Sequence, residues 1–317
     1  MRNRRGVETD MENRESRERA VGIYSGLLAS FLLGWAPILG KLAYQAGVSS
    51  LTLAALRTVV AALFLLVVYL VLWRRMLFIH WRQLLSCLLV GAINGIGSLF
   101  YYSALARLDA AQASLLSTLY VVWVVLFLAA SGQSMTRLTL LRLLASLIGA
   151  ILVTSPWSAT SASNFLGVML MLASAAVNGW YLVMGQWVLA DVPSGSGTLY
   201  ILTGMAVTVL LARVGGGEVS EPVSKMGWVI IGVLGLTTAL SRLAMFFSLE
   251  RLGGVQTAIL SLMELVVSLA LAVFLLGERL SWDQWTGALF LMAGSFLARR
   301  DVEGGGMPPP SFNPMDV

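Results

Sequence analysis

Three charged side chains lie inside long apolar segments of the sequence: Arg57, Arg242 and Glu264. A charge in the core of a bilayer costs about 2.5 to 3.5 kcal/mol on insertion scales unless it is paired or hydrated. Glu264 is close to the middle of the apolar segment 253–276, and each arginine lies roughly 7 Å from it in depth, at about 1.5 Å per helical residue. Either arginine can therefore be its partner, and we predict a coupling site or an intramembrane ion pair.

Two interpretations of this charged group stay open. In the first, Glu264 exchanges a proton or binds a substrate amine during transport. In the second, it forms a permanent pair with an arginine and locks two helices together. Arg57 can likewise be structural, by tying its helix to carbonyl groups at the outer end of a neighbouring helix. Lys41 is expected to extend its amine to the membrane interface.

Polar and aromatic side chains in the apolar segments are candidates for lining a central cavity, because small-molecule sites combine apolar walls with a few hydrogen-bonding groups. The candidates are Trp35, Asn94, Tyr101, Tyr102, Gln112, Ser117, Tyr120, Trp123, Asn178, Trp180, Tyr181, Gln256 and Ser261. Trp and Tyr residues near segment ends also serve as anchors at the membrane surface. Pro37 lies within an apolar segment and has no backbone donor, so we predict a hinge there.

The side chains that most enzymes need are scarce in this sequence. The chain has one histidine, His80, and one cysteine, Cys87, which allows neither a metal-ligand cluster nor a disulfide framework. It contains no phosphate-binding G-x-x-x-x-G-K-[ST] motif, no G-x-S-x-G motif and no H-E-x-x-H motif. We therefore expect no cofactor, no metal site and no enzymatic activity.

The composition indicates a membrane protein. Of 317 residues, 58% are hydrophobic and 12% are charged, and the mean hydropathy is +0.82, whereas soluble domains carry about 25% charged residues. Apolar segments long enough to cross a bilayer as helices are 21–40, 51–73, 83–106, 110–130, 138–155, 164–189, 195–213, 226–249, 253–276 and 282–298. We predict an all-α integral membrane protein with ten transmembrane helices.

The distribution of basic residues predicts the orientation of the chain. With the N-terminus inside, most of the 21 Lys and Arg residues fall on the cytoplasmic side, as the positive-inside rule requires. Both termini are therefore expected in the cytoplasm, with the protein in a bacterial-type inner membrane. The net charge of +5 is spread over many short loops, so the lipid bilayer is an expected partner and nucleic acid is not.

The two halves of the chain are related by an internal repeat. The Gly-Trp pair at 34–35 recurs at 179–180, and spaced residues of 105–117 recur over 249–261. Each half holds five spans, an odd number, so the second half must enter the membrane in the opposite direction to the first. The predicted parts are a polar cytoplasmic tail at 1–20, a first five-helix repeat at 21–155, a second at 164–299 and a flexible cytoplasmic tail at 300–317.

Three short motifs resemble the EamA branch of the drug/metabolite transporter (DMT) superfamily. They are Trp35-Ala-Pro-Ile-Leu-Gly-Lys41, Leu53-Ala-Ala-Leu-Arg57 followed by Thr-Val-Val-Ala-Ala62, and Leu276-Gly-Glu-Arg-Leu280. Their order and spacing, together with the two five-span halves, extend the resemblance over residues 21–299. The resemblance implies ten helices, cytoplasmic termini, alternating access and a central cavity for a small metabolite, and many relatives are exporters.

The chain departs from the pattern of that family in two respects. Relatives often have a proline in spans four and nine, where this chain has Tyr120-Val121 and Glu264-Leu265. Without these prolines, the kinks that shape the cavity of relatives are expected to be absent. In the first half, the Gly-Glu pair of the family becomes Gly132-Gln133.

The sequence therefore predicts a secondary-active permease that exports a small organic metabolite, with protons or another ion as the coupling partner. A passive facilitator or channel is the alternative, and a membrane enzyme or a scaffold without transport is a more distant one. The pairs Gly22/Gly26 and Gly91/Gly95 are GxxxG motifs that let helices approach closely. Whether they act within one chain or between the subunits of a homodimer stays open.

Overall fold

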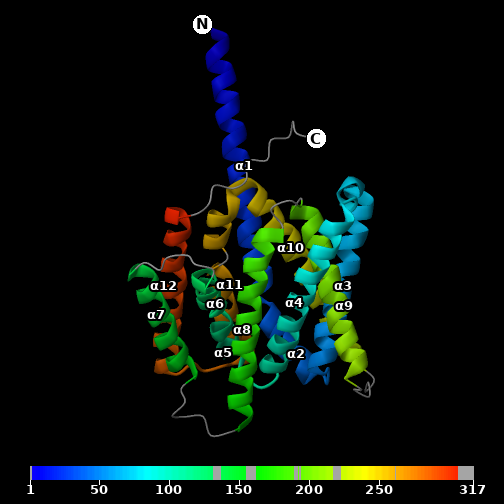
Figure 1. Cartoon of the computed structure of the whole chain (residues 1–317), viewed down its shortest axis with the longest axis vertical. Coiled ribbons are helices and arrows are strands. Elements are labelled where there is room, and N and C mark those ends of the chain that lie inside the picture. Colours follow the sequence, from blue (N-terminus) through cyan, green and yellow to red (C-terminus); the bar gives the residue numbers. More distant parts are fainter. Residues whose placement is uncertain are drawn as a thin grey trace.

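The structure is a computed structural model that describes residues 2–130, 137–154, 162–188, 192, 194–216, 223–260 and 262–305. All regular secondary structure in these ranges is helical (Figure 1). The helices are α1 (Arg2–Gly34), α2 (Ala36–Gln45), α3 (Ser50–Leu72), the 3-10 helix η1 (Arg74–Leu77), α4 (Trp81–Leu105), α5 (Ala110–Ser117), α6 (Tyr120–Ala130), α7 (Arg137–Thr154), α8 (Ala162–Val188), α9 (Ser194–Gly215), α10 (Lys225–Leu260), α11 (Leu262–Leu276) and α12 (Trp282–Gly305).

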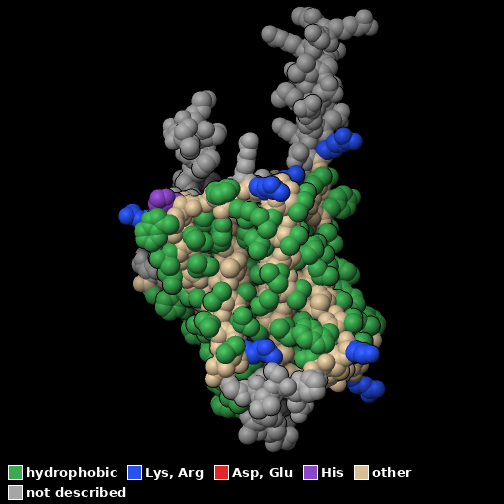
Figure 2. Space-filling model, turned by 90° about the vertical axis from the view of Figure 1, so that its right-hand side faces the viewer, with side chains coloured by type: hydrophobic (Ala, Val, Ile, Leu, Met, Phe, Trp, Pro, Cys, Tyr) green, Lys and Arg blue, Asp and Glu red, His purple; other side chains and the backbone are tan. Residues whose placement is uncertain are grey.

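The helices have the length and the surface of membrane spans. Among the described residues, 7 helical stretches are long and apolar enough to cross a membrane, and the apolar stretches Leu144–Val153 and Met263–Leu276 are shorter. Figure 2 shows basic side chains near both ends of the molecule and a mainly hydrophobic face between them. The prediction of an all-α integral membrane protein is therefore confirmed.

The two repeats run in opposite directions and pack in an equivalent way. In Figure 1, α1 starts at the end that carries the N-terminus, whereas α8, its counterpart in the second repeat, starts at the other end. Gly22 of α1 lies against Leu252 of α10, and Gly167 of α8 lies against Leu108. These two pairs are equivalent in the sequence repeat, so the inverted arrangement predicted from the sequence is confirmed.

The first span is broken where the sequence predicts a hinge. Helix α1 ends at Gly34, Trp35 adopts a turn, and α2 begins at Ala36 with Pro37 in its first turn. Because proline has no backbone N–H, Pro37 cannot donate a hydrogen bond to the carbonyl of Leu33. The counterpart helix α8 continues through the equivalent positions without interruption, so this break belongs to the first repeat.

The fourth span is also broken, which corrects the expectation that a kink would be absent without proline. Helix α5 ends at Ser117 and α6 begins at Tyr120, with two turn residues between them. The hydroxyl of Ser117 donates to the carbonyl of Ser114 (2.7 Å), and that of Thr118 donates to the carbonyl of Leu115 (2.7 Å). These side chains compete for carbonyls that a continuous helix would use, and the backbone tightens to 3-10 bonding.

The corresponding part of span nine is described incompletely. Helix α10 ends at Leu260 and α11 begins at Leu262, and Ser261 lies outside the described residues. The hydroxyl of Ser30 in α1 lies 2.9 Å from the carbonyl of Leu260 and 2.9 Å from the carbonyl of Gly26 in its own helix, so its single proton is shared between the two acceptors. A neighbouring span thus satisfies a backbone group at the end of α10, as apolar surroundings require.

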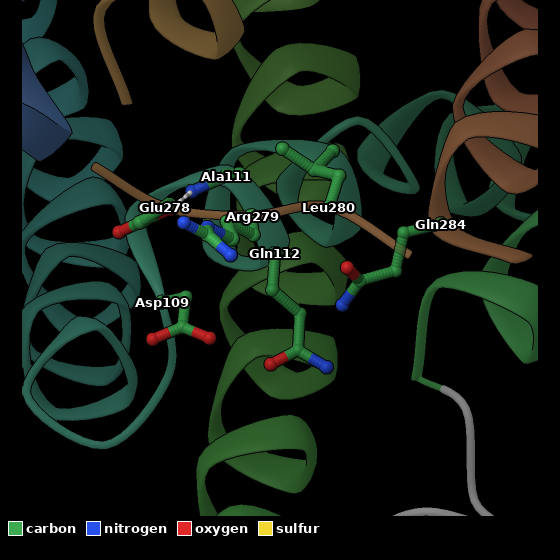
Figure 3. A pocket seen from close by; sticks show the side chains of 7 residues that line it. All are labelled: Asp109, Ala111, Gln112, Glu278, Arg279, Leu280 and Gln284. Carbon is green, nitrogen blue, oxygen red and sulfur yellow. Dashed lines mark hydrogen bonds between the residues drawn. The ribbon is translucent and has the colours of Figure 1, made fainter. Parts of the chain in front are cut away.

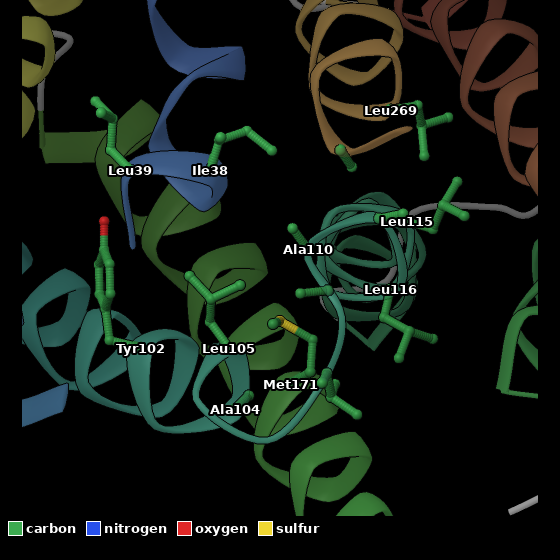
Figure 4. Close-up of a cluster of buried hydrophobic side chains, with 14 of the residues drawn as sticks. Ile38, Leu39, Tyr102, Ala104, Leu105, Ala110, Leu115, Leu116, Met171 and Leu269 are labelled. Atoms are coloured by element: carbon green, nitrogen blue, oxygen red, sulfur yellow. The ribbon is translucent and has the colours of Figure 1, made fainter. Parts of the chain in front are cut away.

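The main hydrophobic core joins both repeats. Figure 4 shows side chains of α2, α4 and α5 meeting Met171 of α8 and Leu269 of α11. Leu105 and Leu116 are fully buried in this cluster. Because these residues come from both halves of the chain, the core fixes the repeats against each other around the polar side chains described next.

Both GxxxG pairs serve packing within the chain. Gly22 and Gly26 lie against α10, and Gly91 and Gly95 lie against α9. A Cβ atom added at Gly91 or Gly95 would meet backbone atoms of α9, so these positions admit little more than glycine. The close approach brings α4, which carries several candidate site residues, directly against the second repeat.

Candidate functional site

Arg57 of α3 lies at the centre of a buried polar cluster that spans the two repeats. Its Nη2 atom donates to Oγ of Ser98 in α4 (2.9 Å), and its Nη1 atom donates to Oγ1 of Thr238 in α10 (3.3 Å). The guanidinium carbon also lies 4.5 Å from the ring centroid of Tyr102. Only 8% of Arg57 is exposed. Its partners are thus side-chain hydroxyls and an aromatic ring, in place of the carbonyl groups expected from the sequence.

Helix periodicity explains how these side chains converge. Ser98 and Tyr102 are four residues apart on α4 and therefore share one face of that helix. Thr238 and Arg242 have the same spacing on α10. The hydroxyl of Thr238 donates to the carbonyl of Leu234 (2.7 Å), so its oxygen is oriented to accept from Arg57. Two helical faces, one from each repeat, therefore meet at the guanidinium.

Glu264 lies in the first turn of α11 and is not bonded to Arg57. Arg242 interacts electrostatically with its carboxylate, and Glu264 in turn acts on Tyr101. Within the described part of the chain, the structure shows no hydrogen bond and no ion pair that involves the side chain of Glu264. Of the two arginines proposed as its partner, Arg242 is thus the one that interacts electrostatically with Glu264. The two side chains are too far apart to form a salt bridge.

Tyrosines connect the two charged groups. Tyr101 interacts electrostatically with both Glu264 and Arg57, and its ring meets that of Tyr102 edge to face, with centroids 5.2 Å apart. The hydroxyl of Tyr44 donates to the carbonyl of Tyr102 (2.8 Å). The site thus combines a guanidinium in contact with an aromatic ring and a tyrosine, Tyr101, that interacts electrostatically with both charged groups.

The other aromatic candidates divide into two groups. Trp35 and Tyr120 are half-buried and pack against the main core. Trp123 stacks on Phe127 with centroids 5.8 Å apart, and Phe127 contacts Trp180 at 6.0 Å. Trp180 itself is 53% exposed, so it lies on the outer surface of the bundle at the edge of this aromatic group.

The remaining candidates are dispersed. Gln112 donates to the carbonyl of Val153 (3.2 Å), and Asn94 and Asn178 are half-buried. None of these three is hydrogen-bonded to Arg57, although Asn94 lies one turn before Ser98 on the same face of α4. Ser117 bonds within its own helix, and Tyr181 packs on a small core formed by Cys87, Val90, Val192 and Ile201. The side chains of Gln256 and Ser261 lie outside the described residues.

A second polar group lies at the end of the bundle where α5 begins (Figure 3). The carboxylate of Glu278 accepts hydrogen bonds from the backbone N–H groups of Ala110 (2.7 Å) and Ala111 (2.8 Å). Lys41 interacts electrostatically with Glu278 and Asp109. The pocket beside Glu278 has a volume of about 10 Å³, which is close to the space that one water molecule needs. It is lined by Asp109, Ala111, Gln112, Glu278, Arg279, Leu280 and Gln284. The pocket is therefore too small to be a solute cavity, and the hydrogen bonds of Glu278 to the start of α5 form a structural link.

Reasoning from the sequence missed three members of the central cluster: Ser98, Thr238 and Tyr44. Serine and threonine are common in membrane helices, so their type alone is a weak signal. The spacing of four residues that separates Ser98 from Tyr102, and Thr238 from Arg242, is the available signal. No cluster of three or more His, Cys, Asp or Glu side chains that could hold a metal ion occurs among the described residues.

The fold and the buried polar cluster define a multi-pass membrane protein of two inverted repeats. The model of the EamA-like transporter family matches residues 20–155 and again residues 165–300. The chain therefore belongs to the EamA-like transporter family and is a membrane transporter, in agreement with the resemblance seen in its motifs.

The chain is also similar to individual proteins. A curated protein of Sinorhizobium sp, named an uncharacterized transporter in the cobO 3' region, is 27% identical over 128 residues, which cover 40% of this chain and 91% of that protein. A solved structure, titled only as the crystal structure of a protein, aligns with a TM-score of 0.62 at 20% identity and covers 90% of this chain and 99% of its own. The second likeness shows the fold.

Proposed function

We propose that this protein is a secondary-active permease that exports a small organic metabolite across a bacterial-type inner membrane, with both termini in the cytoplasm. The observation that carries the proposal is the cluster around Arg57, which joins helices of two oppositely oriented repeats. Sites at such an interface can be opened to either side when one repeat tilts against the other. Export is the direction that the family resemblance favours.

The contacts of Arg57 suit a site that must open and close. Its hydrogen bonds to Ser98 and Thr238 are to neutral hydroxyls, and a hydrogen bond that involves a charged group contributes about 1.5 to 3 kcal/mol net. Such bonds hold one arrangement of the repeats and can be exchanged for others. The breaks at Trp35 and at Thr118 provide points where two of the spans can bend.

Glu264 is the candidate for coupling to protons. Its carboxylate faces Arg242 without a bonded contact, so gain or loss of a proton alters the charge of the site without first breaking a salt bridge. We propose that its protonation changes with the side to which the site is open. In the competing interpretation, Glu264 only holds α11 against α10.

Transport can be tested with purified protein in proteoliposomes. Comparison of metabolites in cells with and without the protein identifies solutes to test, and counterflow of a labelled solute then measures carrier exchange. We expect saturable counterflow that responds to a pH gradient. Glu264→Gln should remove the response to the gradient, whereas Asp283→Asn, at an exposed carboxylate on α12, should not.

Two results would contradict the proposal. Solute flux without saturation or counterflow would indicate a passive channel. If Glu264→Gln kept both the flux and its dependence on pH, the proton-coupling role would be wrong, and a structural role of Glu264 would remain.

A further inference from the structure

The charges in the middle of the spans do not balance. Arg242 and Glu264 interact with each other electrostatically, and together they are neutral while Glu264 is ionised. Arg57 is bonded to hydroxyl groups and covered by an aromatic ring, and none of these carries a formal charge. The central cluster therefore has a surplus of one positive charge, at a side chain of which only 8% is exposed. A buried charge without a counter-charge is costly in apolar surroundings.

One edge of the Arg57 guanidinium has an N–H group without a hydrogen-bond acceptor. The Nε atom is buried and has no hydrogen-bond partner. The Nη2 atom, which shares this edge with Nε, is held by Ser98, while Nη1 on the other side is held by Thr238. An Nε–Nη edge offers two parallel N–H groups that match the two oxygens of a carboxylate. Ser98 fills only half of that edge, and a hydroxyl is a weaker acceptor than a carboxylate.

We propose that Arg57 binds the carboxylate of the transported solute, so that the substrates are organic monocarboxylates. This inference rests on the proposed transport function. The carboxylate accepts from Nε and Nη2 and displaces Ser98, while Thr238 keeps Nη1 in place. While Glu264 is ionised, a single negative charge equals the surplus in the cluster, which a phosphate dianion would exceed. The rings of Tyr101 and Tyr102, on the same helix as Ser98, provide apolar surface for the rest of the solute.

The Ser98 hydroxyl has a definite role in this scheme, because it holds the empty site closed. Ser98→Ala frees Nη2 without touching the charge. We expect it to tighten carboxylate binding about tenfold, which corresponds to the lower end of the range for a hydrogen bond that involves a charged group. If Arg57 served only to join the repeats, the same substitution would lower the melting temperature and leave carboxylate binding unchanged.

Binding can be measured on the purified full-length protein in detergent at constant ionic strength. Melting temperature and tryptophan fluorescence are recorded with matched pairs of probes: acetate and acetamide, butyrate and butyramide, benzoate and benzamide. The wild-type protein should bind at least one carboxylate more tightly than its amide. Arg57→Gln should weaken that binding by about tenfold or more, the range for a hydrogen-bonded charge. Arg82→Gln, an exposed arginine on α4, is the control and should bind like the wild type.

Several outcomes would overturn the inference. It fails if no carboxylate binds better than its amide, or if Arg57→Gln retains the preference. If Arg57→Gln does not fold, Ser98→Ala decides, because unchanged carboxylate affinity would contradict the displaced-hydroxyl scheme. Counterflow of cationic or neutral solutes alone would overturn the inference and leave the transport function intact. Carboxylate binding without any flux would support the inference and contradict the proposed transport function.

Discussion

Removal of Glu278 should loosen the start of α5. The carboxylate of Glu278 accepts from the N–H groups of Ala110 and Ala111, at 2.7 and 2.8 Å. The residue at the cap position of this helix, Asp109, makes no side-chain cap bond. Glu278, which lies 168 residues after Ala110, therefore caps this helix in place of Asp109. It also joins the second repeat to the first at this end of the bundle.

The expected magnitude follows from known capping energies. Loss of an N-cap side chain costs about 0.5 to 2 kcal/mol, and a negative charge beside a helix N-terminus contributes about 0.3 to 1 kcal/mol. Glu278 is half-buried and makes two bonds, so Glu278→Ala should lower the free energy of local opening by about 2 kcal/mol. That loss corresponds to about 30-fold faster hydrogen exchange at Ala110 and Ala111, provided exchange occurs through local opening.

Hydrogen–deuterium exchange of the protein in lipid nanodiscs measures this effect, on peptides that cover residues 108–118. Glu278→Gln keeps an oxygen acceptor but loses the charge, so its exchange should lie between those of wild type and Glu278→Ala. Arg279→Gln changes an exposed neighbour and should leave exchange unchanged. If Ala110 and Ala111 exchanged at the wild-type rate in Glu278→Ala, the capping role derived from the geometry would be refuted.

Two further predictions concern helix packing and bending. A Cβ added at Gly149 of α7 would lie 2.8 Å from the carbonyl oxygen of Gly287 in α12, so Gly149→Ala should destabilise the protein by about 1 to 3 kcal/mol. Nothing lies within 4 Å of such an atom at Gly232, so Gly232→Ala should stabilise α10 by up to about 1 kcal/mol. The melting temperature should therefore fall in Gly149→Ala and rise in Gly232→Ala, and a shift in the same direction in both variants would contradict this reasoning. Pro37→Ala restores a donor for the carbonyl of Leu33 and should raise the melting temperature while slowing solute counterflow; unimpaired counterflow would show that the break in the first span is not used as a hinge.

Local sequence patterns were sufficient for the architecture. Long apolar segments predict membrane helices because a helix satisfies nearly all of its backbone groups within its own segment. The recurrence of the Gly-Trp pair predicts the repeat, and the odd number of spans in each half predicts its inversion. The break at Pro37 follows from one missing N–H group. These features depend on residues close together in the chain or on the order of the spans.

The break in the fourth span shows where such reasoning was wrong. The absence of proline predicted a fourth span without a kink, whereas Ser117 and Thr118 produce the break by bonding to carbonyls of the preceding turn. Serine and threonine in membrane helices can bond back in this way or point elsewhere, and the sequence alone does not choose between these arrangements.

The sequence by itself determined that three charges lie in the spans, and only the tertiary structure decided their partners. Arg57 bonds to Ser98, 41 residues away, and to Thr238, 181 residues away. Each pairing depends on which helical faces meet across the repeats, and that is set by the packing of glycines and of the shared hydrophobic core. Hydropathy and spacing describe one helix at a time, so they place a charge at a depth in the membrane. They do not specify which side chain of another helix it contacts.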